Sequence, residues 1–172
     1  MAYKVKFKNI INYQPNTYDY NLKNNRAGIV LTVPSFTTVS SLAYALRIDT
    51  KSNYDKALNI FNWVRDYVEY SYYYGTRYGA SGTLKILKGN CVDLSRLIVS
   101  LAKYSGVFAR YKYGTCYFYK SHEWISHVWT NLYANGSWYA ADASNNINNF
   151  GVIKSWNTSN FILNGIYRTL PF

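Results

Sequence analysis

The chain contains little cysteine and no long apolar run. Of its 172 residues only two are cysteines, Cys91 and Cys116, which are too few for a disulfide framework and fit no zinc-binding spacing. No run of ~20 apolar residues is present to span a membrane, and the segment after Met1 lacks the apolar core of a signal peptide. We therefore expect a soluble chain that is made in the cytoplasm and has no membrane partner.

Acidic residues are also scarce, at 8 against 19 lysines and arginines, which gives a net charge of +11. A positive field of this size favours anionic partners such as nucleic acid, an acidic wall polymer or a membrane surface, without selecting one. The basic residues are scattered singly except for Lys4, Lys6 and Lys8, whose alternation is typical of the solvent face of a strand. Because neither a dense basic stripe nor a nucleic-acid-binding motif is present, we expect no nucleic-acid partner.

What the chain does have is apolar and aromatic side chains. Hydrophobic residues make up 49% and aromatic residues 19%, including 20 tyrosines. This composition is too apolar for a disordered chain and the length suits one core, so we expect residues 1–172 to form a single, monomeric domain. The tyrosines predict either a surface that stacks on sugars and hydrogen-bonds to a polymer, or half-buried strand packing with hydrated hydroxyl groups.

Helical periodicity in the first part of the chain changes to strand periodicity in the second. Residues 1–38 are expected to supply lead-in strands at 3–11 and 27–33, and residues 39–172 to form the core. No element is assigned to the tail after Asn145. Helices followed by consecutive antiparallel strands favour an α+β fold. The core helices are expected near 42–46 with a cap among residues 37–40, near 53–68 with Ser52 or Asn53 as the cap, and at 83–88 and 91–105. Strands are expected at 107–119, 124–133 and 137–143, with a bulge or kink at Gly114.

One thiol occupies a position that favours chemistry. Cys91 lies where the loop ending in Gly89 and Asn90 meets the apolar run 94–102 of an expected helix. The partial positive charge of a helix N-terminus stabilises a thiolate and lowers the pKa of a cysteine, and the thiolate is the form that attacks carbonyls. Asp93, in the first turn, is expected to serve the helix dipole and not catalysis.

A histidine and an aspartate are expected to meet on a hairpin. Asn135 and Gly136 are typical of a two-residue type I′ turn. That turn pairs Trp129 with Asp142 and places His127 diagonally from Asp142 on the same face. Diagonal neighbours have Cα atoms about 7–8 Å apart, which lets an imidazole and a carboxylate meet. A histidine held in this way has one nitrogen left to take a thiol proton.

If the helix N-terminus packs against this hairpin, Cys91, His127 and Asp142 form a thiol triad of the kind used for acyl transfer. Each residue also has an ordinary structural interpretation. A cysteine near a helix start is often a small buried hydrophobe, and a histidine and an aspartate on one strand face can form a structural hydrogen bond. Cys116, inside a strand, is assigned to packing, and His122 is expected to lie off the triad face.

Three blocks of the sequence resemble, in the same order, the signature blocks of the transglutaminase-like superfamily. They are Gly-Asn-Cys-Val-Asp at 89–93, His-Val-Trp at 127–129 and Gly-Ser-Trp-Tyr-Ala-Ala-Asp-Ala-Ser at 136–144. Within the superfamily, residues 78–95 most resemble the catalytic domain of pseudomurein endoisopeptidases, which are enzymes of archaeal viruses and proviruses that lyse methanogen cell walls. The resemblance implies a transglutaminase-like, papain-like cysteine-protease fold, with the cysteine at a helix N-terminus packed on an antiparallel sheet that carries the histidine and the aspartate.

The resemblance also implies roles for individual residues. Cys91 would be the nucleophile, His127 the general base and acid, and Asp142 the residue that orients His127. The oxyanion would be met by the backbone N–H of Cys91 and by a second donor, for which Asn90 and Tyr78 are the candidates. The thiol chemistry needs no cofactor, but the resemblance implies that a divalent cation such as calcium can support activity, with no ligands assigned.

The activity implied by the resemblance is hydrolysis of the isopeptide bond between alanine and a lysine side-chain amine in pseudomurein, by an endolysin that reaches the wall when the host lyses. Two alternatives stay open. A transglutaminase-type acyl transferase differs only in whether an amine or water meets the thioester first, and a surface or adhesion module with a relic triad would not be catalytic. Another lineage of wall peptidases usually shows Asp-Cys-Ser-Gly at its cysteine, which Asn-Cys-Val-Asp at 90–93 does not match.

Overall fold

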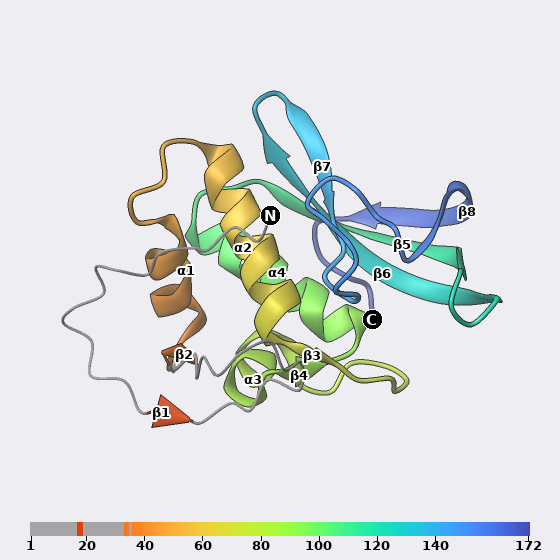
Figure 1. Cartoon of the computed structure of the whole chain (residues 1–172), viewed down its shortest axis with the longest axis horizontal. Coiled ribbons are helices and arrows are strands. Elements are labelled where there is room, and N and C mark those ends of the chain that lie inside the picture. Colours follow the sequence, from red (N-terminus) through yellow and green to blue (C-terminus); the bar gives the residue numbers. More distant parts are fainter. Residues whose placement is uncertain (1–16, 19–32, 35) are drawn as a thin grey trace, which may run out of the picture. The chain divides into compact units, whose positions relative to one another are not determined.

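The computed structural model describes residues 17–18, 33–34 and 36–172, and the chain divides into two units, Met1–Thr37 and Thr38–Phe172. In the first unit, β1 (Thr17–Tyr18) pairs antiparallel with β2 (Val33–Pro34). The strand expected at 3–11, and all of the strand expected at 27–33 except its last residue, lie outside the described residues. The second unit contains the remaining helices and strands (Figure 1), and it includes the three residues of the expected triad.

Two helices with capped N-termini open the second unit. α1 (Val39–Arg47) begins after Thr38, whose hydroxyl accepts a hydrogen bond from the N–H of Ser41. α2 (Asn53–Tyr67) begins after Ser52, whose hydroxyl accepts from the N–H of Asp55. These caps satisfy N–H groups that the first turn of a helix leaves unpaired. Both helices therefore begin where the sequence predicts, and the apolar stripe of α2 is buried at Ala57, Ile60, Phe61, Trp63 and Val64.

The helix that starts with the cysteine packs on several partners at once. α4 (Cys91–Tyr104) contacts α1, α2 and α3 (Gly79–Ile86) as well as the larger sheet. Ser105 caps its C-terminus, and Gly106 follows with a φ of 70°, a left-handed conformation that favours glycine. The helix thus has the bounds that the sequence predicts, and its buried apolar residues are Val92, Leu94, Leu97, Ile98, Leu101 and Ala102.

A short parallel pair leads the chain into α4. β3 (Glu69–Tyr70) pairs with β4 (Lys88–Gly89), with Tyr70 opposite Gly89. A Cβ atom at position 89 would lie 2.8 Å from the Cβ of Asp93, so glycine is what lets β4 approach the first turn of α4. The pair therefore brings Tyr70 beside the residues that directly precede Cys91.

The larger sheet is antiparallel, with strand order β7-β6-β5-β8. β5 (Ala109–Phe118), β6 (Glu123–Ala134) and β7 (Ser137–Ala141) follow one another as hairpins, and β8 (Trp156–Tyr167) returns beside β5. Figure 1 shows the helices gathered on one side of this sheet, and α4 packs against β5 and β6. This is the α+β arrangement that the sequence predicts.

The turn between β6 and β7 has the predicted geometry. Asn135 and Gly136 both have positive φ, at 47° and 79°, as a type I′ turn requires. Thr130 lies opposite Ala141, which is the register that this turn predicts.

β8 is a long strand that is not predicted from the sequence. Its apolar residues do not alternate with polar ones, because Phe161, Ile162 and Leu163 stand together and two of them, Ile162 and Leu163, are exposed. A strand at the edge of a sheet with this pattern lacks the period of two that identifies a strand with one buried face.

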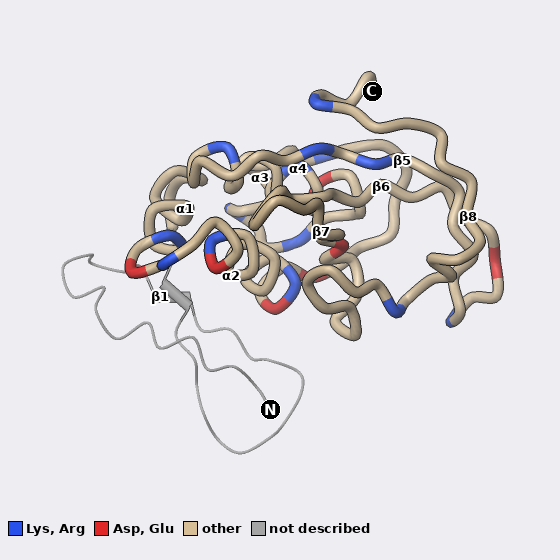
Figure 2. The backbone as a smooth tube through the Cα atoms, turned by 90° about the horizontal axis from the view of Figure 1, so that it is seen from above, with Lys and Arg blue, Asp and Glu red and all other residues tan. Residues whose placement is uncertain are grey.

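Charge is spread over the second unit. Figure 2 shows lysine and arginine positions on helices, strands and loops, and not in one continuous stripe. The alternating lysines at 4, 6 and 8 lie outside the described residues. Within the part of the chain that is described, every helix is too short or too polar to cross a membrane.

Gly114 marks the irregularity between β5 and β8. The pairing with β8 shifts register between Tyr113 and Gly114, whereas the pairing with β6 continues unbroken. A Cβ atom at position 114 would lie 2.6 Å from the carbonyl oxygen of Ile162. The bulge expected at this glycine is therefore present, and it allows the two backbones to approach closely.

Gly114→Ala is expected to lower the free energy of unfolding by about 1–3 kcal/mol, because the backbone of β8 must move away from the added methyl group. Denaturant unfolding followed by tryptophan fluorescence measures the change, with Thr115→Ala as a control at the next position of β5. A variant as stable as the wild type would show that the backbone of β8 can move away from the methyl group without a loss in the free energy of unfolding.

Candidate active site

The nucleophile candidate occupies the first helical position of α4. Asn90 caps this helix, because its Oδ1 accepts from the N–H groups of Val92 and Asp93 at 3.0 and 3.1 Å. The N–H of Cys91 makes no hydrogen bond within the described part of the chain. It is therefore free to meet an anion at the helix start.

Cys91 lines the same cleft as the ring of His127 and the backbone of Val128. Burial by itself raises the pKa of Cys91. The nearby imidazole of His127, its positive charge when protonated and the N–H of Val128 together outweigh that effect, so the pKa of Cys91 lies below its ordinary value. The site thus stabilises a thiolate.

The structure brings His127 and Asp142 together. His127 lies in β6 and Asp142 directly follows β7, and the Nε2 of His127 is 2.9 Å from the Oδ2 of Asp142. Both side chains are only 2% exposed. Burial by itself lowers the pKa of His127. The charge and hydrogen bond of Asp142 outweigh that effect, so the pKa of His127 lies well above its usual range. With Nε2 held by Asp142, Nδ1 is the ring nitrogen left for the thiol.

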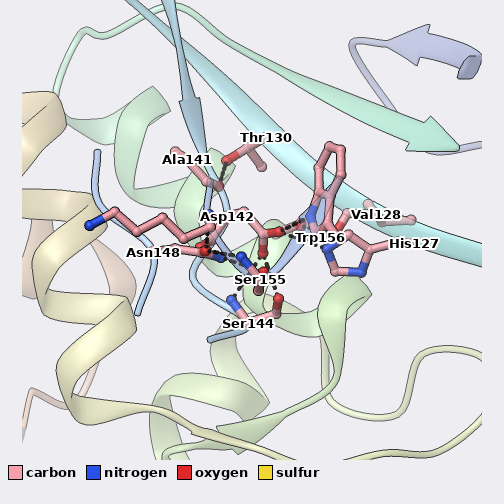
Figure 3. A network of polar contacts seen from close by, with 11 residues as sticks. His127, Val128, Thr130, Ala141, Asp142, Ser144, Asn148, Ser155 and Trp156 are labelled. Carbon is pink, nitrogen blue, oxygen red and sulfur yellow. Dashed lines mark hydrogen bonds and ion pairs between the residues drawn. The ribbon is translucent and has the colours of Figure 1, made fainter. Parts of the chain in front are cut away.

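The carboxylate of Asp142 is surrounded by donors. Besides His127, the indole Nε1 of Trp156 donates to Oδ2 at 2.8 Å, and the N–H and hydroxyl of Ser144 donate to Oδ1 at 3.1 and 2.6 Å (Figure 3). Desolvation raises the pKa of Asp142, and the charge of His127 with these hydrogen bonds lowers it more strongly. Because both oxygens face donors only, a carboxylate fits here and an amide does not.

Asn148 closes the loop between two of these donors, Ser144 and Trp156. Its buried side chain donates to the carbonyl of Asp142 and to the hydroxyl of Ser155, and it accepts from the N–H groups of Lys154 and Ser155. These four bonds use the full capacity of the amide. They fold residues 143–155 back on themselves, so that Trp156 at the start of β8 reaches Asp142 (Figure 3).

Aromatic rings shield the His127–Asp142 pair. The ring of Trp129 stacks on His127 with centroids 6.0 Å apart and planes 13° apart, and the ring of Phe118 meets His127 edge-on at 5.1 Å. Such walls exclude water and strengthen the electrostatic interaction inside.

Asp93 ties a tyrosine-rich loop to the start of α4. Its buried carboxylate accepts from the hydroxyls of Tyr73 and Thr76 and from three consecutive backbone N–H groups, at residues 77–79. Burial raises the pKa of Asp93, and these hydrogen bonds lower it below the ordinary value. From the sequence, Asp93 is predicted to serve the helix dipole alone, because its loop partners lie 14 or more residues away in the chain.

Neither proposed oxyanion side chain offers a donor at the thiol. Both amide hydrogens of Asn90 are taken, one by the carbonyl of Tyr73 and one by the carbonyl of Gly75. Tyr78 precedes α3 and packs its ring edge-on against Tyr73, outside the residues that line the cleft around Cys91. Tyr70 does line that cleft, and sequence reasoning missed it because only the β3–β4 pairing brings it there.

Cys91 opens into a cleft with a volume of about 1310 Å³. Residues of the loop 70–75 and of the hairpin between β5 and β6 line it together with Cys91 and His127. Among the described residues, no group of three or more histidine, cysteine, aspartate or glutamate side chains is placed to hold a metal ion. The calcium dependence implied by the resemblance stays a prediction.

Comparisons with known proteins identify the fold. A family model described as the transglutaminase-like superfamily matches residues 40–143. The solved structure of a candidate cysteine protease from Cytophaga hutchinsonii superposes with a TM-score of 0.55 at 22% identity, over 75% of this chain and 48% of that one. The chain thus spans about half the length of that protein. These matches confirm the transglutaminase-like α+β fold expected from the sequence.

Two further solved structures show weaker likeness. A TGase superposes with a TM-score of 0.49 at 15% identity, over 70% of this chain and 35% of that one. Legionella pneumophila LapG superposes with a TM-score of 0.47 at 12% identity, over 72% and 75% of the two chains. No curated protein matches the sequence significantly. None of the matches named here concerns pseudomurein, so the narrower resemblance stays a prediction.

Asp142→Asn is expected to lower the pKa of His127 by about 1–3 pH units, because the charge that raises it is removed and the amide must turn its NH₂ toward donors. NMR titration of the His127 ring measures this pKa directly. Alkylation of Cys91 by iodoacetamide at neutral pH should also slow, since the thiolate loses its imidazolium partner.

Asp66→Asn, at an exposed position of α2, serves as the control and should change neither quantity. A His127 ring that titrates at the same pH in Asp142→Asn and in the wild type would contradict the assigned coupling.

Proposed function

Because the chain belongs to the transglutaminase-like superfamily, we propose that it is a cysteine peptidase that cleaves isopeptide bonds in a cell-wall polymer. The observation that carries the proposal is that Cys91 and His127 line one cleft while His127 is hydrogen-bonded to Asp142 behind it. Nucleophile, base and orienting acid stand in the order that thiol-dependent acyl transfer needs.

In this mechanism His127 takes the thiol proton, and the sulfur of Cys91 bonds to the carbonyl carbon of the isopeptide. The oxygen becomes an oxyanion at the start of α4, where the N–H of Cys91 stabilises it. His127 then gives its proton to the lysine side-chain nitrogen as the C–N bond breaks, which leaves a thioester and a free amine. His127 next deprotonates a water molecule that attacks the thioester, and this releases the carboxylic acid and the thiol.

Tyr70 is the second oxyanion donor in this proposal. Burial raises the pKa of its hydroxyl, and the nearby negative charges of Cys91 and Asp142 raise it further, so the group stays protonated and able to donate. Its backbone is held beside Gly89, two residues before the nucleophile.

The proposed substrate is the bond between alanine and the lysine side chain in pseudomurein. Two observations support it: the resemblance of residues 78–95 to the wall-lytic enzymes, and a cleft larger than the ~300–1,000 Å³ typical of small-molecule sites. On this proposal the protein acts as a monomer at the wall after release from the lysed host.

Cys91→Ala is expected to abolish release of lysine side-chain amines from isolated pseudomurein under reducing conditions, because no other residue of the triad can form the thioester. Amines are quantified by fluorescent labelling, with bacterial peptidoglycan as the second substrate. Cys116→Ala, at a buried cysteine outside the cleft, should keep the activity.

The same assay separates the alternatives. Release of amines from peptidoglycan alone would show that the protein is a peptidase with a substrate other than pseudomurein. Incorporation of an added primary amine in place of hydrolysis would identify an acyl transferase. No reaction with either wall polymer, with or without added amine, would contradict the enzyme proposal and favour the non-catalytic adhesion module.

Tyr70→Phe is expected to lower kcat on the order of 10²-fold with little change in KM, because the lost hydrogen bond forms only in the transition state. Steady-state kinetics on an alanine–lysine isopeptide measures both constants. Tyr113→Phe removes another hydroxyl from the cleft lining and should leave kcat near the wild-type value. Equal effects of the two variants would remove Tyr70 from this role.

A further inference from the structure

Large aromatic side chains gather, exposed, on the cleft that contains Cys91. Tyr72 is 64% exposed, Tyr74 87% and Trp124 48%, and all three line the cleft. Exposed apolar groups scattered singly need no explanation, but a set of them gathered on one cleft marks a binding surface. We call these three residues the aromatic rim.

The rim is held in place before any ligand arrives. Asp93 accepts hydrogen bonds from Tyr73 and Thr76, which lie on either side of Tyr74, and so anchors the loop to α4. The rings of Tyr72 and Tyr74 meet edge-on with centroids 5.7 Å apart. On the hairpin, the ring of Trp124 packs against Tyr117, also at 5.7 Å. A preorganised rim loses little conformational entropy on binding.

The chemistry of the cleft favours sugars over an aliphatic peptide chain. Its aliphatic lining is limited to Val92, Ile125 and Val128, whereas polar and charged side chains stand beside the aromatic ones. A pyranose ring has apolar C–H faces that stack on aromatic rings and a border of hydroxyl groups that hydrogen-bond to polar side chains. The polar lining of the cleft includes Lys120, Ser121, Glu123, Ser126, Ser144 and Asn145.

From this we infer that the aromatic rim is a glycan subsite, which binds the sugar rings next to the peptide bridge that Cys91 cleaves. The inference rests on the proposed function for the bond that is broken, and it adds that the enzyme recognises a peptide attached to a glycan strand. The volume of the cleft, about 1310 Å³, accommodates both parts of such a substrate.

The test compares two substrates that share the scissile bond. Trp124→Ala, and separately the pair Tyr72→Ala with Tyr74→Ala, are expected to lower kcat/KM on the intact wall polymer about tenfold. Both should leave kcat/KM on a short, sugar-free alanine–lysine isopeptide within about twofold. Trp124→Phe keeps an aromatic face and should retain most of the polymer activity.

Tyr104→Ala is the matched control. Tyr104 is a tyrosine of similar exposure, at 56%, and it lies at the opposite end of α4 from Cys91, about 20 Å along the helix. Tyr104→Ala should leave kcat/KM unchanged on both substrates. An equal loss on the polymer and on the short isopeptide would show that the rim serves the peptide, and would overturn the glycan subsite.

A binding experiment separates this inference from the proposed function. Cys91→Ala protein is mixed with wall glycan strands from which the peptides have been removed, and the Kd is measured with and without Trp124→Ala. We expect binding that weakens about tenfold in the double variant, whether or not the wild type cleaves any bond. Failure of Cys91→Ala to bind the stripped strands, or binding unaffected by Trp124→Ala, would overturn the subsite.

Discussion

The carboxylate of Asp142 is the group on which the rest of the site depends. A buried charge costs several kcal/mol unless it is paired and hydrogen-bonded. Asp142 meets that requirement with donors from three separate parts of the chain: His127 in β6, Ser144 after β7 and Trp156 at the start of β8. The need to satisfy one carboxylate therefore sets the position of the base, of the loop 143–155 and of the last strand together.

A second buried aspartate does the same for the other half of the site. Asp93 stands two residues after Cys91 and anchors the loop that carries Tyr72 and Tyr74, two of the three residues of the aromatic rim. Asn90 contributes in both directions, since its carbonyl oxygen caps α4 and its NH₂ binds the carbonyls of the same loop. The short motif Gly-Asn-Cys-Val-Asp thus encodes the helix start, the thiol and the cleft wall, and Gly89 is needed because a Cβ there would meet Asp93.

Features set by neighbouring residues could be predicted from the sequence. The caps at Thr38 and Ser52, the start of α4 and the turn at Asn135 follow from local side-chain chemistry, and that turn alone placed His127 near Asp142. Features set by distant residues could not. Asn90 looked free to bind an oxyanion because its loop partners are 15 or more residues away. β8, and with it Trp156, lacks alternation because it is an edge strand with exposed apolar residues.

The loop that Asn148 closes extends the part of the chain that the catalytic site needs. The family match ends at residue 143, after the nucleophile, base and acid have all been passed. The indole that completes the environment of the acid lies 13 positions further on, and it reaches the site only because a fully bonded amide closes the intervening loop. A graft of residues 40–143 onto another scaffold would carry the reactive side chains but leave a charged carboxylate short of donors, so the smallest transferable catalytic module extends into β8.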